Sequence, residues 1–200
     1  MTSSAEKKLR KEVCEIGQRM AERGLVTAMD GNISVRLDDE RFLFTPTGCN
    51  LGAMSAEDLV VTDEDGTPVG EGDVTSEYRL HLVCYRSRPD VESVIHAHPP
   101  HSVAATVAGV RLDKPVLPEV VFTLGSIPTL PYATPASVES SEAIKGHVET
   151  YDAMLLDRHG PVTLGGDLQE AYMKLEKVEH AAQVGRQIRA VFPAEAAADA

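Results

Sequence analysis

A pair of histidines at the end of a short apolar segment most constrains how this chain can fold. Segment 91–97, VESVIHA, is short, β-branched and apolar, which predicts a buried strand. Alternate residues of a strand face the same side of a sheet, so His96 and His98 are expected to project together. Pro99-Pro100 then ends the strand, because proline cannot donate to a ladder of hydrogen bonds. Two imidazoles that converge at a strand end are half of a zinc site.

An H-x-H pair alone does not establish a metal site. An acidic residue and a third histidine strengthen the inference. Segment 75–88 reads as a helix, with Thr75 or Ser76 as its N-cap and Glu77 in its first turn. His159 follows another apolar, strand-like run and stands just before a Gly-Pro break. Three histidines and a carboxylate are typical of a catalytic zinc site with room for substrate.

The rest of the pattern indicates an α/β protein. Helical and strand-like segments alternate irregularly, and several strands are joined by hairpin turns. We therefore expect three αβα layers, with helices around a central mixed, largely antiparallel sheet. A single domain over 1–192 is expected, with 193–200 as a disordered, alanine-rich tail. Outside the histidine region, helices are predicted over 5–23, 101–107, 137–151 and 167–191, and strands over 33–36, 41–45, 59–62 and 153–156.

The charge balance and the N-terminus narrow the possible partners. The formal net charge is −12, which argues against nucleic acid and against anionic membranes as partners. The N-terminal segment lacks the apolar core of a signal peptide, and no apolar run is long enough to span a membrane, so a cytoplasmic protein is expected. A small phosphorylated substrate stays possible, because backbone N–H groups, hydroxyls and a metal can bind phosphate locally.

Six segments, taken in order, resemble the zinc-dependent class II aldolase/adducin family, and most closely its L-fuculose-1-phosphate aldolase branch. The resemblance extends from Val26 to about Val184 and is specific for the family, though not for one substrate. The segments are GNISVR (31–36), TPTG (45–48), TSEYRLH (75–81), SRPDVESVIHAH (87–98), IPTLPYAT (127–134) and DRHG (157–160).

The resemblance implies a metal centre, a phosphate pocket and an assembly. Zinc would be held by His96, His98 and His159, although manganese or cobalt could replace it. Glu77 would be the catalytic acid/base, and also a metal ligand when substrate is absent. A homotetramer with active sites at subunit interfaces is implied. The implied phosphate-binding residues are Asn32, Thr47, Gly48, Thr75 and Ser76.

The implied activity is that of a lyase. It would cleave a ketose 1-phosphate, such as L-fuculose 1-phosphate or a 5-deoxypentulose 1-phosphate, to dihydroxyacetone phosphate and a short aldehyde. Segment 111–125 departs from the family pattern, because it lacks the tyrosine that serves the aldolase as a proton donor. Glu119 is the candidate substitute. The C-terminal tail also lacks a tyrosine, and both absences weaken fuculose phosphate itself as the substrate.

Other activities on the same fold are alternatives. They are a methylthioribulose-1-phosphate dehydratase, a sugar-phosphate epimerase, an oxo-acid phosphate decarboxylase, and a non-catalytic binding module like the adducin head. Epimerases of this family tend to carry aspartate where Glu77 stands, and the adducin head lacks the metal ligands. His81, four residues after Glu77, is interpreted as a structural hydrogen-bonding residue rather than a ligand.

Overall fold

A single sheet forms the middle layer of the molecule. The computed structural model describes residues 3–114 and 117–191. Within them the strands form a seven-stranded sheet in the order β3-β2-β1-β4-β7-β6-β5. Every neighbouring pair is antiparallel except β5 and β6, which are parallel. The strands are β1 Asn32–Arg36, β2 Phe42–Phe44, β3 Val60–Thr62, β4 Ser93–His96, β5 Thr129–Leu130, β6 Ala153–Leu156 and β7 Gly160–Gly165.

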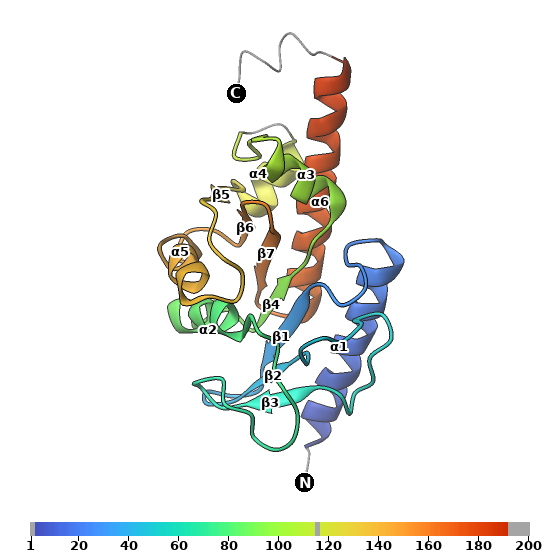
Figure 1. The fold of residues 1–200 in the computed structure, drawn as a ribbon, viewed down its shortest axis with the longest axis vertical. Helices are drawn as coiled ribbons and strands as arrows, with labels where there is room; N and C mark the ends of the chain where they lie inside the picture. Colours follow the sequence, from blue (N-terminus) through green and yellow to red (C-terminus); the bar gives the residue numbers. More distant parts are fainter. Residues whose placement is uncertain (1–2, 115–116, 192–200) are drawn as a thin grey trace.

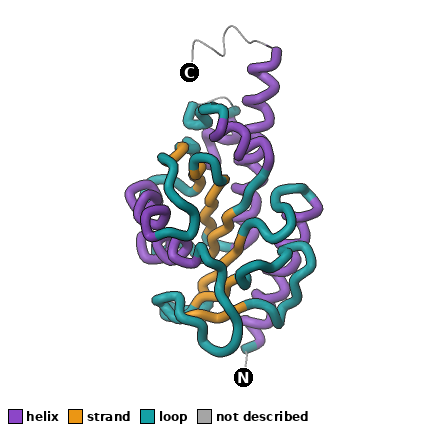
Figure 2. Tube along the Cα trace, viewed as in Figure 1, coloured by secondary structure: helices purple, strands orange, loops and turns teal. Residues whose placement is uncertain are grey.

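Helices cover both faces of this sheet. Helices α1 and α6 lie on one side and α2 and α5 on the other, to the right and the left of the strands in Figure 1. Figure 2 shows the same layers as purple helices on either side of orange strands. The expected three-layer α/β fold with a mixed, largely antiparallel sheet is therefore confirmed. The helices are α1 Ser4–Glu22, α2 Tyr78–Ser87, α3 Pro100–Val107, α4 Pro118–Leu124, α5 Val138–Val148 and α6 Leu168–Val191.

Strand alternation decides which side chains enter which layer. In β4, Ile95 packs into the core formed with α1 and α6, whereas Val94 packs into the core formed with α2 and α5. His96 is two residues after Val94, so it projects toward α2. In β1, Ile33 likewise joins the α1/α6 core, which leaves Asn32 on the α2 side. The sheet thus directs polar groups of two neighbouring strands toward one helix.

Three local features differ from the sequence expectations. Helix α2 begins at Tyr78, and Glu77 is its N-cap residue, so neither Thr75 nor Ser76 caps it. Strand β4 is shorter than the predicted segment, and His98 lies beyond its end. Strand β7 starts directly after His159, at the Gly-Pro pair that the sequence pattern marks as a break. Pro161 is accommodated because it lies at the start of the strand, where its missing N–H costs least.

Some expectations lie outside the described residues or remain untested. The predicted tail, 193–200, is outside the described part of the chain. The single domain over 1–192 stays a prediction. Among residues 3–114 and 117–191, none of the helices combines the length and the apolar character required to cross a bilayer. The cytoplasmic location stays a prediction.

Two glycines let neighbouring segments approach the end of β4. A side chain at Gly31, whose φ is +79°, would come within 2.8 Å of Val26 and 2.9 Å of the carbonyl oxygen of His96. A side chain at Gly160 would overlap the carbonyl oxygen of Ala97. Close packing of backbone against backbone therefore holds the histidine-bearing segments together.

We expect Gly160→Ala to destabilise the fold by on the order of 2–4 kcal/mol, because the added methyl group meets backbone that cannot move aside cheaply. The matched control is Gly109→Ala: Gly109 has a φ of +65°, and a methyl group added there would meet nothing within 4 Å. Gly109→Ala should lower the free energy of unfolding only by the local backbone strain, about 1–2 kcal/mol. Urea unfolding measures the stability of both variants. Equal losses of stability would show that contact with the backbone of Ala97 is not the cause of the effect at Gly160.

Candidate metal centre

Four side chains from three segments bring potential ligand atoms to one point. They are Glu77, His96, His98 and His159, and one ligand atom of each lies within 4.8 Å of all the others. The Nε2 atom of His96 is 2.9 Å from Nε2 of His98 and 3.2 Å from Nε2 of His159. The carboxylate of Glu77 is 3.4 Å from His96 Nε2 and 3.5 Å from His159 Nε2. The structure thus assembles the four residues that the sequence analysis singled out as ligands.

These distances fit a tetrahedral cation site. Ligands about 2.0–2.1 Å from a tetrahedral zinc ion lie about 3.3 Å from one another, close to the separations found here. Within the described residues, Glu77 Oε1 is also one of the few buried side-chain atoms that lack a hydrogen-bond partner. A buried carboxylate oxygen without a partner is costly unless a cation faces it. The residues present therefore fit a divalent metal.

The ring of His96 is held in the orientation that a metal ligand needs. Its Nδ1 donates a hydrogen bond to the carbonyl oxygen of Pro161 at 2.9 Å, which leaves the lone pair of Nε2 directed at the cluster. Burial, followed by the neighbouring His159 and His98, holds the pKa of His96 well below its usual value. Burial likewise lowers the pKa of His159. Both rings are consequently neutral near pH 7, and neutral imidazole is the form that binds metals.

An unusual backbone conformation places His159. Arg158 has a φ of +56°, and its N–H donates to the Thr106 hydroxyl at 3.0 Å. The tight turn that results points His159 back at β4. On the other side, His98 Nδ1 lies 3.7 Å from the Asp30 carboxylate. A surface hollow beside the cluster is lined by His98, Pro100, Val103, Ala104, Val107, Ala108, Arg158 and His159, which gives a substrate a way in.

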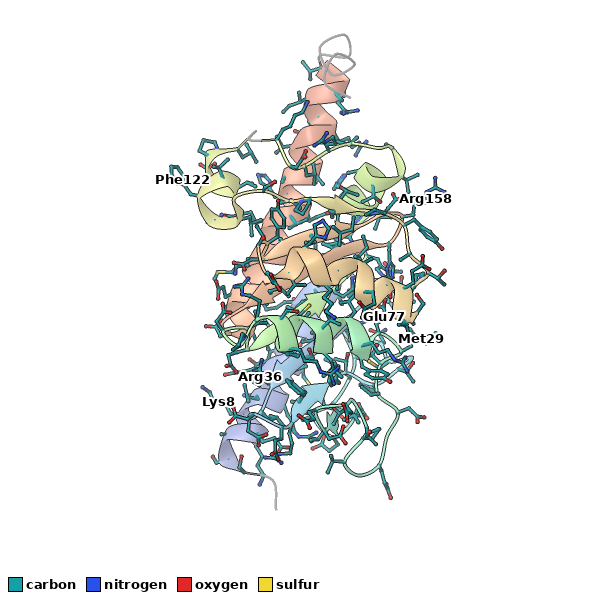
Figure 3. All side chains as sticks on the ribbon, turned by 90° about the vertical axis from the view of Figure 1, so that its left-hand side faces the viewer. Lys8, Met29, Arg36, Glu77, Phe122 and Arg158 are labelled. Atoms are coloured by element: carbon teal, nitrogen blue, oxygen red, sulfur yellow. The ribbon has the colours of Figure 1, made fainter. Side chains whose placement is uncertain are left out.

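The Glu77 carboxylate is held at the start of α2, as Figure 3 shows. Its Oε2 accepts a hydrogen bond from the side-chain amide of Asn32 at 2.8 Å and lies near His96, while Oε1 lies near His159. The family resemblance implies that Asn32 binds phosphate. Its NH₂ group has a second hydrogen beyond the one given to Glu77, so that role stays a prediction.

The other predicted phosphate residues lie on two adjoining segments. The N–H of Thr47 donates to the carbonyl of Asp73 at 3.0 Å, and the N–H of Thr75 donates to the carbonyl of Thr45 at 3.2 Å. Thr47, Gly48 and Ser76 are exposed, whereas Thr75 is buried. The segment that contains Thr75 and Ser76 leads directly to Glu77, and the segment that contains Thr47 and Gly48 is hydrogen-bonded beside it. Glu119, the suggested substitute proton donor, is exposed in the first turn of α4 and is not part of the cluster.

The structural hydrogen-bonding role predicted for His81 is confirmed, because both of its ring nitrogens have hydrogen-bond partners. Sequence reasoning missed Ser34 and Tyr85, which extend the same network. His81 and Tyr85 follow Glu77 at intervals of four, and Ser34 is two residues after Asn32 on β1. The spacing 77, 81, 85 puts three polar side chains on one helical face. That pattern was the available signal for a buried polar network.

The family model for the class II aldolase and adducin N-terminal domain matches residues 11–185. The chain belongs to this family. The match contains all four clustered residues and covers most of the chain.

Two groups of relatives in the family carry different activities in their names. The chain is 34% identical over 189 residues to a 3-oxo-tetronate 4-phosphate decarboxylase of Haemophilus influenzae, covering 92% of this chain and 88% of that protein. It is also 34% identical over 173 residues to an L-fuculose phosphate aldolase of Methanococcus maripaludis, covering 86% of this chain and 93% of that protein. Identity alone does not separate the two activities.

Solved structures agree with this assignment. YgbL of Escherichia coli, described as a putative aldolase/epimerase/decarboxylase, superposes with a TM-score of 0.88 at 30% identity over 92% of this chain and 91% of that chain. The L-fuculose-1-phosphate aldolase of Thermus thermophilus gives a TM-score of 0.83 at 27% identity, over 95% and 97% of the two chains.

We expect the wild-type chain to bind about one equivalent of zinc. His159→Ala removes a ligand, so its affinity for zinc should fall by at least about 100-fold. The control is His101→Ala, because His101 lies outside the cluster. Competition with a chromogenic chelator measures both. Tight binding that survives His159→Ala would show that the metal is held elsewhere.

Proposed function

We propose that this chain is a divalent-metal-dependent lyase that breaks a carbon–carbon bond beside the carbonyl group of a phosphorylated sugar or sugar acid. The observation that carries the proposal is the cluster of three imidazole nitrogens and a carboxylate, one of whose oxygens has no partner, at the edge of an open hollow. Zinc is the first candidate metal, because its preferred ligands are nitrogen and carboxylate oxygen at these separations.

Each part of the site has a distinct task in such a reaction. A bound cation would supply Lewis-acid stabilisation of the negative charge that develops on the substrate's carbonyl oxygen. The partnerless oxygen of Glu77 is placed to carry a proton to the carbon that loses its substituent. Thr47, Gly48 and Ser76 offer hydroxyl and backbone N–H groups to the phosphate, which anchors the substrate away from the reacting bond.

Two substrate classes lead to the same intermediate. A 3-oxo-tetronate 4-phosphate that loses carbon dioxide, and a ketose 1-phosphate that loses an aldehyde, both leave the enediolate of dihydroxyacetone phosphate. One proton on carbon then completes the product in each case. A single site can therefore serve either class, and the departing group distinguishes them.

We place decarboxylation of an oxo-sugar-acid phosphate first, which reverses the order expected from the sequence. Release of an aldehyde requires a group that accepts the proton of the substrate hydroxyl, whereas carbon dioxide departs without one. Segment 111–125 lacks the tyrosine expected of an aldolase. The decarboxylase name of the Haemophilus influenzae relative supports this order. Cleavage of a ketose 1-phosphate is the second candidate, supported by the Methanococcus maripaludis aldolase.

An assembly of several subunits is part of the proposal. Val107 at the end of α3 is 62% exposed and belongs to the hollow beside His98 and His159. Phe122 of α4 is 88% exposed and points away from the body of the molecule in Figure 3. We infer that these two exposed apolar side chains contribute to contacts between subunits. We expect sedimentation to give a mass four times that of the chain, and a monomer at micromolar concentration would rule the homotetramer out.

We expect the metal-loaded protein to release dihydroxyacetone phosphate from one of two substrate classes. The panel contains a 3-oxo-tetronate 4-phosphate, L-fuculose 1-phosphate, a 5-deoxypentulose 1-phosphate and methylthioribulose 1-phosphate, with carbon dioxide and aldehyde measured in parallel. Carbon dioxide in equal amount to dihydroxyacetone phosphate supports decarboxylation, and aldehyde supports the second candidate. Turnover of only a methylthioribulose phosphate, or of none of these compounds, would overturn the proposal.

The variant Glu77→Gln tests the acid/base role in the same assay. It should retain the metal through the three histidines and lose turnover by about 100- to 10,000-fold, the usual contribution of a general acid or base. Turnover near the wild-type rate would remove Glu77 from the chemistry while leaving the metal centre in place.

A further inference from the structure

A buried chain of hydrogen bonds connects Glu77 to the interior of α2. Glu77 Oε2 accepts from Asn32 Nδ2 at 2.8 Å, and the Asn32 Oδ1 atom lies 2.5 Å from His81 Nε2. On the other side of the ring, His81 Nδ1 is 2.6 Å from the hydroxyl of Ser34. That hydroxyl is 2.7 Å from the phenol oxygen of Tyr85. Five side chains thus form one continuous path that ends at the Glu77 carboxylate, whose other oxygen, Oε1, has no hydrogen-bond partner.

The ionised carboxylate determines the direction of every hydrogen bond in this path. A carboxylate only accepts, so Asn32 must present its NH₂ group to Glu77 and its carbonyl oxygen to His81. His81 must then donate from Nε2, which leaves Nδ1 as an acceptor. Ser34 therefore donates to Nδ1, and the Tyr85 hydroxyl donates to Ser34. One tautomer of His81 satisfies all the groups together.

The path lies in the dry interior between β1 and α2. The exposed fractions of Ser34 and His81 are 0%, and those of Tyr85, Asn32 and Glu77 are 2%, 3% and 7%. Burial, with a further contribution from the nearby His96, lowers the pKa of His81 to about 3. The ring is accordingly neutral, as the direction of the hydrogen bonds requires. Because these groups are shielded from bulk solvent, each hydrogen bond constrains its neighbours strongly.

This arrangement treats the two oxygens of Glu77 differently. Both oxygens lie near a histidine, Oε2 at 3.4 Å from His96 Nε2 and Oε1 at 3.5 Å from His159 Nε2. Oε2 also accepts the hydrogen bond from Asn32, whereas Oε1 has no hydrogen-bond partner. Glu77 is the N-cap residue of α2, and its side chain forms no capping hydrogen bond that would orient it otherwise. The amide of Asn32 therefore sets the rotation of the carboxylate, and His81 sets the amide.

We propose that His81 is a positioning residue: through Asn32 it holds the Glu77 carboxylate with one oxygen anchored and the other free to exchange a proton with substrate. The inference rests on the proposed acid/base role of Glu77. Ser34 and Tyr85 support it by keeping the imidazole in the Nε2–H tautomer. The substrate class served is the phosphorylated sugar or sugar acid of the proposed reaction.

The first test compares substitutions at His81. Replacement by Leu removes the donor to Asn32, and we expect kcat to fall about 100-fold with KM within about threefold, because a misplaced reacting group costs rate rather than binding. Replacement by Gln retains a donor near the position of Nε2 and should restore kcat to within about tenfold of wild type. If kcat of the Gln variant is no higher than kcat of the Leu variant, the hydrogen bond that residue 81 donates to Asn32 does not position Glu77.

Leu82→Ala is the matched control for loss of stability. Leu82 is a buried neighbour on α2, 2% exposed, and it is outside the path. The control should lower the thermal midpoint at least as much as His81→Leu and leave kcat within about threefold of wild type. A purely structural role for His81 predicts equal kcat in the two variants, and that result would overturn the proposal.

Two measurements decide the inference without turnover. In the metal-free chain labelled with ¹⁵N-histidine, His81 should show the Nε2–H tautomer from pH 6 to 8, and an Nδ1–H tautomer would overturn the assignment. With cobalt(II) bound, the visible absorption spectrum should change in His81→Leu but not in Leu82→Ala, because Glu77 is displaced only in the first. An unchanged cobalt spectrum in His81→Leu would also overturn the positioning role of His81.

Lack of wild-type turnover on every substrate would count against the proposed function alone.

Discussion

The site depends on one constraint: a carboxylate and three imidazoles are packed so closely that one ligand atom of each lies within 4.8 Å of the others. Glu77 Oε1 is buried and lacks a hydrogen bond, and two imidazole nitrogens lie 2.9 Å and 3.2 Å from a third. Imidazole nitrogens and a carboxylate oxygen without a hydrogen bond tolerate such closeness when a cation lies among them. The surrounding fold is built to enforce this convergence, and catalysis of the proposed kind requires the same arrangement.

The sheet and α2 enforce it together. Alternation along β4 turns His96 toward α2, and the same alternation along β1 turns Asn32 and Ser34 to that side. Gly160 permits the His159 turn to pack against the end of β4. The metal ligands and the hydrogen-bonded path behind Glu77 therefore share one layer of the protein, between the sheet and a single helix. Binding and proton transfer are positioned by the same packing.

Much of the fold could be predicted from local pattern. The apolar segment 153–156 predicts a strand and is β6, and Ser137 caps α5 as its position suggests. The errors have physical causes. Gly160-Pro161 is a break signal by composition, yet β7 begins there, because pairing with β4 and β6 outweighs local propensity. The predicted N-cap of α2 is wrong by one or two residues, since Glu77 is held by Asn32 rather than by a capping bond.

The amino-acid sequence alone establishes which residue types are present and how they are spaced. The H-x-H pair, the Glu77 that precedes it, and a third histidine before a glycine are enough to indicate a metal centre, because strand and helix periodicity follow from local stereochemistry. The order of six short segments along the chain indicates the family. The meeting of the four ligand atoms within 4.8 Å, by contrast, follows only from how the layers pack. The same packing places His81, Ser34 and Tyr85 behind Asn32, because contacts between β1 and α2 join residues about fifty positions apart. No local pattern specifies such a contact, since it depends on the approach of a helix to a distant strand.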